Sequence, residues 1–161
     1  MLELTCHTRV TTADPGSFPE YVYNPTPFSE LKNFVGDRKK IHDVLGILVE
    51  VAEPEWVPFS NQPKPNLRRN ITIKDASDIE IQISLRGQKA LNFTIESSES
   101  SVEHIPTAIL LTGCLVKAYQ RQLYLSGHSA CHWYLNPNIP ESHNLIQRKM
   151  AALALSLSHG Y

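Results

Sequence analysis

The sequence has no apolar run close to the roughly 20 residues that a membrane-spanning helix needs, and no signal peptide opens it. Its three cysteines, Cys6, Cys114 and Cys131, are an odd number without CxxC spacing, which argues against a disulfide framework. Cysteines of this kind are typical of a reducing compartment. We therefore expect a soluble intracellular protein without disulfide bonds.

An excess of charge of either sign is also lacking. The chain carries 15 Lys and Arg residues against 16 Asp and Glu residues, and aromatic residues make up only 8% of it. Proteins dedicated to nucleic acids usually carry a basic surplus, because phosphate contacts dominate their affinity. The balance argues mildly against strong nonspecific binding, so any nucleic-acid binding depends on a local basic patch and on few stacking aromatics.

The sequence lacks a Gly-rich phosphate-binding loop and a recognisable nucleophile–base signature. His128, Cys131 and His132 are the nearest approach to a metal-binding cluster, with Cys6 and His7 distant in the sequence. Their spacing fits no standard zinc pattern, and adjacent strand residues such as Cys131 and His132 point to opposite faces. We predict no enzymatic activity, no metal site and no cofactor.

What is present, 161 residues of which 42% are hydrophobic, suits one domain with a proper core. The clearest element is a hairpin in which residues 69–74 and 80–86 alternate strictly between polar and apolar, joined by a turn at 75–78. Alternation places one set of side chains in the interior: Ile71, Ile73, Ile81, Ile83 and Leu85. The other set forms a polar outer face: Asn70, Thr72, Lys74, Glu80, Gln82, Ser84 and Arg86.

The remaining segments predict a mainly β domain at 28–161, preceded by an extended lead-in at 1–27. The expected elements are a short helix at 29–36, strands at 41–51, 108–119 and 122–134, a short helix with an acidic Ser-rich loop within 88–105, and a C-terminal helix at about 138–158. Gly46 within the first strand suggests a bulge or a sharp bend. Four prolines between residues 53 and 66 predict a long loop, which carries Trp56 and Phe59.

Several strings of residues resemble, in order, the second DNA-binding OB domain of the replication protein A large subunit. Phe28-Ser29-Glu30-Leu31 precedes the barrel as in that family; His42-Asp43-Val44-Leu45-Gly46-Ile47 resembles its Val-Asp-Val-Ile-Gly-Val; Arg69-Asn70-Ile71-Thr72-Ile73-Lys74-Asp75 resembles Arg-Asp-Leu-Thr-Leu-x-Asp; Ser84-Leu85-Arg86-Gly87 resembles Thr-Leu-Trp-Gly; and Asn136-Pro137-Asn138-Ile139-Pro140-Glu141 nearly repeats Asn-Pro-Asp-Ile-Pro-Glu. The resemblance covers nearly all of the chain from about residue 22. It implies an all-β fold, a five-stranded OB barrel with a short helix between strands three and four and a C-terminal helix, in which the polar outer face of the hairpin receives nucleic acid.

The resemblance also implies two stacking positions, of which one has changed. Where the family carries a tryptophan that stacks on a base, this chain has Arg86, whose guanidinium can stack on a base or pair with a phosphate. Tyr119 matches the second stacking aromatic. Because base stacking contributes roughly 1–3 kcal/mol per base, losing one platform costs ~10-fold or more in affinity. The alternatives are structural: Arg86 as a surface charge paired with an acid such as Glu80, and Tyr119 as a cap on the barrel.

Further candidates lie around the long loop and in the last hairpin turn. Those for phosphate contacts are basic: Lys64, Arg68, Arg69, Lys74 and Arg121. A cluster of charges is more often just a solvated face. Trp56 and Phe59 either fold back on the core or are offered to a ligand.

The C-terminal helix is a candidate for contacts between chains. Pro140 suits its first turn, and Glu141 complements the N-terminal end of its dipole. Apolar residues then recur at helical spacing: Ile146, Met150, Leu153 and Leu157. This stripe is longer than a small barrel needs, and in the resembling family C-terminal helices of OB domains also build the subunit bundle. We expect part of the helix to pair with a second copy of the chain or with another chain; the alternative is that it only seals the barrel.

Two functions follow as hypotheses. The first is a module that binds single-stranded DNA, or RNA, without catalysis, in nuclear DNA replication, repair or recombination. Tyr119, the loop aromatics and the basic cluster favour it. The second is an OB domain that has weakened or lost nucleic-acid binding and contacts proteins instead. Arg86, the balanced charge and the acidic loop favour this second function.

Overall fold

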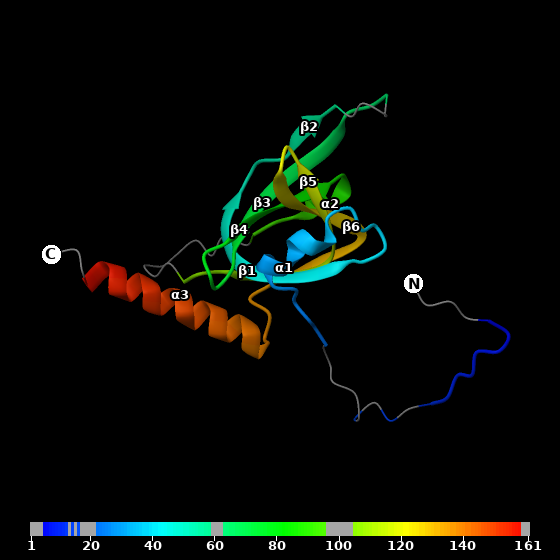
Figure 1. The fold of residues 1–161 in the computed structure, drawn as a ribbon, viewed down its shortest axis with the longest axis horizontal. Helices are drawn as coiled ribbons and strands as arrows, with labels where there is room; N and C mark the ends of the chain where they lie inside the picture. Colours follow the sequence, from blue (N-terminus) through cyan, green and yellow to red (C-terminus); the bar gives the residue numbers. More distant parts are fainter. Residues whose placement is uncertain are drawn as a thin grey trace.

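The computed structural model describes residues 5–12, 14, 16, 22–58, 63–95 and 105–158 (Figure 1). Its strands are β1 His42–Val51, β2 Glu55–Val57, β3 Asn66–Lys74, β4 Glu80–Arg86, β5 Ala108–Tyr119 and β6 Gln122–Leu135. Its helices are α1 Phe28–Leu31, the 3-10 helix η2 Lys32–Phe34, α2 Gln88–Asn92 and α3 Pro140–Ser158. None of the described helices is long and apolar enough to cross a membrane.

Five of the strands pair into a closed ring. β1 pairs with both β5 and β3, β4 joins β3 to β6, and the β5–β6 hairpin completes the circle. Every pair is antiparallel except β4–β6, which is parallel. The ring, with α2 between β4 and β5 and α3 after β6, confirms the predicted five-stranded OB barrel.

The long loop predicted at 53–66 contains a further strand. β2 pairs antiparallel with β3, from Glu55↔Arg68 to Val57↔Asn66, at the edge of the sheet. Prolines stand immediately before and after β2 and none lies within it, so its backbone N–H groups are free to pair at an edge. The prediction of an uninterrupted loop, which was based on the number of prolines, was therefore wrong for these three residues.

The β3–β4 hairpin has the register that alternation predicts. All five side chains expected in the interior are buried: Ile71, Ile73, Ile81, Ile83 and Leu85. Ile71 lies opposite Ile83, and Ile73 opposite Ile81. In the turn, the Asp75 carboxylate accepts hydrogen bonds from the backbone N–H groups of residues 77 and 79, at 2.8 and 2.9 Å. The opposite face of these two strands is therefore the polar one.

At Gly46, β1 approaches the end of β3 closely, and the irregularities in the register of β1 lie on either side of this glycine. The register of β1 shifts on either side of it, between residues 42 and 44 against β5 and between residues 48 and 50 against β3. A Cβ at Gly46 would lie 3.0 Å from the backbone oxygen of Lys74. Any larger residue would therefore push β1 away from the end of β3.

The last residues of the lead-in are attached to β1. The Thr26 N–H donates to the backbone oxygen of Asp43 at 2.7 Å, and the Thr26 hydroxyl lies 3.0 Å from Nδ1 of His42. The Tyr23 and Tyr134 rings lie 5.7 Å apart between centroids. Residues 23–26 therefore pack with the barrel.

α3 begins at Pro140, two residues after the expected start at about 138, and its first half contacts the barrel. Leu145 is buried in a small cluster with residues of β1 and β5. One turn later, the Lys149 ammonium pairs with the Asp78 carboxylate at the β3–β4 turn. From Met150 to Ser156 every side chain is exposed, and the helix projects past the barrel (Figure 1).

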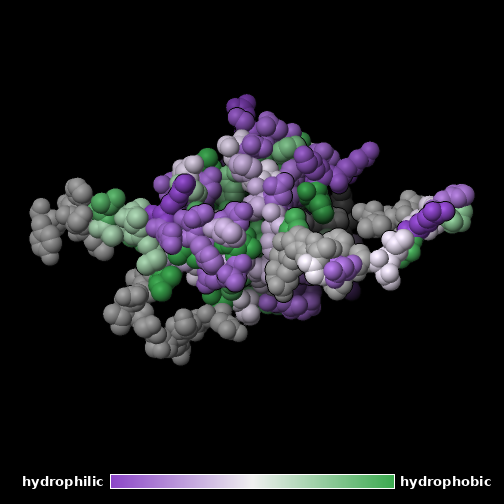
Figure 2. All heavy atoms as spheres, turned by 90° about the horizontal axis from the view of Figure 1, so that it is seen from below, coloured by the Kyte–Doolittle hydropathy of each residue, from purple (hydrophilic) through white to green (hydrophobic). Residues whose placement is uncertain are grey.

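The predicted apolar stripe of α3 is mostly uncovered. Ile146 is half-buried against the barrel, whereas Met150 and Leu153 are 46% and 49% exposed. The side chain of Leu157 lies outside the described residues. Figure 2 shows the end of α3 as a green and pale-green projection at the left of a largely purple surface. The seal on the barrel is therefore made by Leu145 and Ile146, and Met150 and Leu153 do not contribute to it.

Candidate nucleic-acid interface

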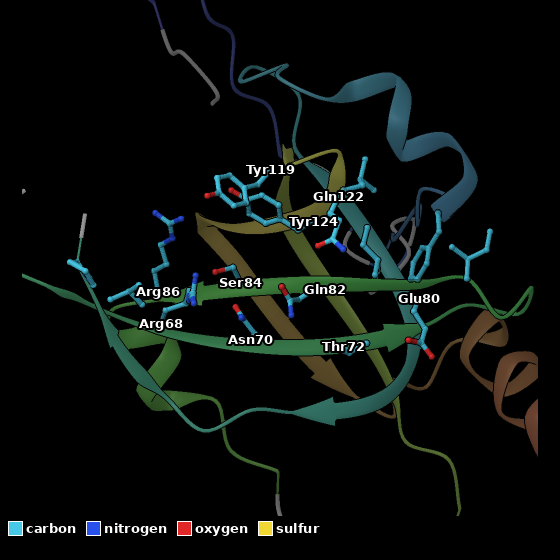
Figure 3. Close-up of a pocket in the computed structure, with 16 residues that line it drawn as sticks. Arg68, Asn70, Thr72, Glu80, Gln82, Ser84, Arg86, Tyr119, Gln122 and Tyr124 are labelled. Atoms are coloured by element: carbon cyan, nitrogen blue, oxygen red, sulfur yellow. The ribbon is translucent and has the colours of Figure 1, made fainter. Parts of the chain in front are cut away.

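A groove of about 810 Å³ crosses the polar outer face of the barrel (Figure 3). Its floor comes from β3 and β4, and one wall comes from the β5–β6 hairpin. Phe28 of α1 and Val57 of β2 also line the groove, together with Pro58 and Ile79. The groove lies on the face that the alternation of residues 69–86 predicts as polar.

The centre of the floor offers groups that can hydrogen-bond. Asn70 lies opposite Ser84, and Thr72 lies opposite Gln82. Ser84 is only 5% exposed, and its hydroxyl has no hydrogen-bond partner among the described residues. Burying a hydroxyl without a partner is costly, so a ligand group that bonds to it gains affinity.

The two ends of the floor differ in charge. Arg68 and Arg86 lie opposite each other at one end, whereas Lys74 lies opposite Glu80 at the other. Figure 3 shows the two arginines gathered at the left and Glu80 at the right. The ends are about 20 Å apart along β4, since a strand rises roughly 3.3 Å per residue.

Two tyrosines form the aromatic wall. Tyr119 is 68% exposed at the tip of the β5–β6 hairpin, and Tyr124 is half-buried opposite Gln82 in the β4–β6 pair. Figure 3 shows both above the strand that carries Ser84. The turn residues Gln120 and Arg121 both have positive φ, 49° and 66°, as a tight two-residue hairpin turn requires. Aromatic faces over a hydrogen-bonding floor can stack bases.

Three of the predicted phosphate contacts are engaged within the protein. Arg68 pairs with Glu55 at 2.6 Å, and Lys74 pairs with Glu80 at 3.0 Å. The hydrogen bond and the charge of Glu80 raise the pKa of Lys74. Arg69 donates to the backbone oxygens of Ala52 and Phe93, at 2.8 and 2.5 Å. Arg69 shares a strand face with the buried isoleucines and does not line the groove. Its hydrogen bonds instead connect the segments that contain Ala52 and Phe93.

The other predicted contacts lie at the margin of the groove or outside the described residues. Trp56 is 69% exposed but shares a face with Leu67, its partner on β3, and not with the groove-lining Val57. Arg121 is exposed in the hairpin turn and does not line the groove. Phe59 lies outside the described residues. Among the predicted residues, the groove therefore brings together Arg68, Arg86 and Tyr119.

A protein-family model described as "Replication protein A OB domain" matches residues 29–125, which are more than half of the chain. The chain belongs to the replication protein A OB-domain family. The replication protein A 70 kDa DNA-binding subunit of Drosophila melanogaster is 31% identical over 134 residues, which are 82% of this chain and 20% of the relative. The chain thus spans about a fifth of that relative's length.

A solved structure has the same fold as this chain. One chain of a replication protein A heterotrimer bound to ssDNA matches with a TM-score of 0.68 and 22% identity. The match covers 92% of this chain and 32% of that chain. It therefore extends the shared fold to nearly all of the chain.

Two residues on the groove side of the barrel were missed by the sequence reasoning. Tyr124 lies between Leu123 and the buried Leu125, so alternation in the last hairpin would have placed it on the outer face. Lys117 lies opposite Tyr124 in the β5–β6 pair. Burial, followed by the positive charges of Arg86 and Arg38, lowers the pKa of Lys117. No spacing in the sequence indicates that these three cations are neighbours.

Proposed function

We propose that this OB domain binds single-stranded DNA in the groove, without catalysis. The observation that carries the proposal is the pair Tyr119 and Tyr124 above the hydrogen-bonding floor of β3 and β4. Membership of the family supports it, because the Drosophila relative is named a DNA-binding subunit and the matching solved protein is bound to ssDNA. The domain alone spans a small part of either relative.

In this arrangement the tyrosines stack on neighbouring bases. The hydroxyl of Ser84 and the amide of Gln82 face the base edges from below. Arg86 lies flat on a further base or contacts a phosphate. Because ion pairs already occupy Arg68 and Lys74, few cations remain for the backbone, and the salt dependence of binding is shallow.

Fluorescence anisotropy with a labelled oligo-dT at two salt concentrations tests this function. We expect saturable binding that an unlabelled single strand displaces and a duplex of the same sequence displaces poorly, since paired bases cannot stack on the tyrosines. An RNA strand of the same sequence tests the preference for DNA. Absence of saturable binding to either single strand would contradict the proposal.

As the setting of this activity we propose the nucleus and DNA replication, repair or recombination, because the curated relative is a replication protein. Fluorescence microscopy of the tagged chain before and during a replication block tests the setting. An even distribution outside the nucleus in both states would contradict it.

The second candidate function is protein interaction through α3. It is favoured by the exposed Met150, Leu153 and Leu155 on the part of the helix that projects from the barrel. We propose that this part pairs with a second copy, since each such side chain buried adds roughly 1.5–3 kcal/mol before association costs. Light scattering at high micromolar concentration tests it, and a monomer mass would rule out the homodimer.

A further inference from the structure

The Arg86 end of the groove carries more positive charge than its lining alone shows. Arg86 itself lines the groove, and two further cations, Lys117 and Arg38, lie close enough to act on one another electrostatically. These residues come from β4, β5 and the turn before β1. They are thus brought together only by the fold.

The β5–β6 register places Lys117 on the groove side of the barrel. Residues directly opposite in an antiparallel pair point to the same face, and Lys117 lies opposite Tyr124, which lines the groove. Tyr119 lies two residues further along β5 and so on that same face. Lys117 is half-buried there. Its side chain therefore leaves β5 on the face that carries the aromatic wall.

The turn that carries Arg38 is ordered by contacts on both sides. The Gly36 N–H faces the backbone oxygen of Val116 at 3.4 Å, which places the turn alongside β5. The Asp37 carboxylate accepts hydrogen bonds from the N–H groups of Lys39 and Lys40, at 2.9 and 3.3 Å. Arg38 is exposed between these anchored residues.

We propose that Arg38, Arg86 and Lys117 form a phosphate subsite that holds an internal phosphate of the strand beside the base stacked on Tyr119. The inference rests on the proposed function of the groove. Like charges held together destabilise one another in the free protein; burial first, and then the charges of Arg86 and Arg38, lower the pKa of Lys117. A phosphate relieves the repulsion as well as adding its own hydrogen bonds. The strand is thereby anchored at the Arg86 end, whereas Lys74 and Glu80 at the other end neutralise each other.

Single substitutions that remove one charge each test the subsite. We expect Lys117→Gln and the more exposed Arg38→Gln to weaken oligo-dT binding roughly threefold to tenfold at low salt, and to reduce the salt slope by about 0.7. Lys32→Gln, an exposed lysine of η2, removes the same charge elsewhere and is the control. It should leave the slope unchanged. Thermal melting of each variant confirms that the barrel is folded.

Oligonucleotides with one neutral methylphosphonate linkage identify the phosphate itself. Moving this linkage along the strand should weaken binding to the wild type most at one internal position. At that position the Lys117→Gln variant should show little further loss, because the charge and its partner are then both absent. Equal losses in the wild type and the variant at every position would overturn the subsite.

The outcomes separate this subsite from the function on which it rests. If wild type binds oligo-dT and Tyr119→Ala weakens binding, but both charge variants keep the wild-type affinity and salt slope, the subsite is wrong and the groove stands. If wild type binds no single strand, both proposals fail together. If Lys32→Gln loses as much affinity as Lys117→Gln, the effect is due to the net charge of the protein, and the subsite is also wrong.

Discussion

The two long hairpins of the barrel are built differently. The β3–β4 pair runs in unbroken register from Arg68↔Arg86 to Lys74↔Glu80, and its inward side chains are buried. The β5–β6 pair changes register between residues 112 and 114, and both residues of its turn have positive φ without being glycine. The regular hairpin forms the floor of the groove, while the irregular one holds two tyrosines and Lys117 beside it. The inward side chains of the first hairpin therefore stabilise the fold, whereas the tip of the second hairpin is exposed and offers an aromatic side chain beside the groove.

The largest expected effect tests the stability side of this comparison. Ile83→Ala removes a fully buried side chain of β4 and should lower the free energy of unfolding by about 2–4 kcal/mol. Tyr119→Ala, in the other hairpin, should change it by less than about 0.5 kcal/mol because the ring is mostly exposed. Urea unfolding measures both, and similar values for the two variants would break the comparison.

Tyr119→Ala should instead act on binding. We expect roughly tenfold weaker affinity for single strands of different sequence, since every base offers a face for stacking. Tyr134→Ala is the matched control, because Tyr134 is also partly exposed on β6 but contacts Tyr23 outside the groove. Anisotropy titrations with oligo-dT and oligo-dA measure the change, and an equal loss in the control would remove the groove from the explanation.

Arg86→Trp tests the difference between the polar floor and the aromatic wall, because it adds an aromatic side chain to the floor. We expect roughly fivefold tighter binding of oligo-dT, because the stacking surface of the resembling family is restored. The salt slope should fall at the same time, since one cation of the phosphate subsite is lost. Unaltered affinity would mean that Arg86 is an idle surface charge, and the protein-interaction function would then be favoured.

The smallest effect is expected at the turn of the irregular hairpin. Arg121→Gly places a residue that tolerates positive φ where φ is 66°. We expect the free energy of unfolding to rise by roughly 0.5–1 kcal/mol, partly offset by the greater freedom of glycine in the unfolded chain. Oligonucleotide affinity should be unchanged, because Arg121 does not line the groove. A marked loss of affinity would restore Arg121 as a phosphate contact.

The sequence predicts the features of this fold that depend on neighbouring residues, and it does not predict those that depend on contacts between residues far apart in the chain. The floor of the groove is predicted because alternation is local: once Ile71 and Ile83 point inward, Asn70 and Ser84 must point outward. β2 was missed, since three residues between prolines carry too little pattern. Arg69 was misplaced because its partners are backbone oxygens of residues 52 and 93, which no local pattern reveals.

The charges of the groove were the hardest part to predict. A basic cluster in the sequence says nothing about which acids will lie opposite, and Glu55 and Glu80 take up two of its members. Lys117 and Arg38 lie 79 positions apart and meet only because the turn at Gly36 packs on β5. Tyr124 could have been predicted, because it precedes the buried Leu125 on a strand, but no motif singles it out.

The parallel β4–β6 pair has a consequence for how the groove comes into being. It joins Gln82 to Tyr124, so the floor and the aromatic wall meet only where this pair closes the ring. Pairing between such distant segments carries a high entropy cost and is expected late in folding. A chain with both hairpins formed but the ring still open has no complete site. We therefore expect DNA bound in the groove to stabilise the β4–β6 pair, and to slow hydrogen exchange along β4 and β6 more than elsewhere.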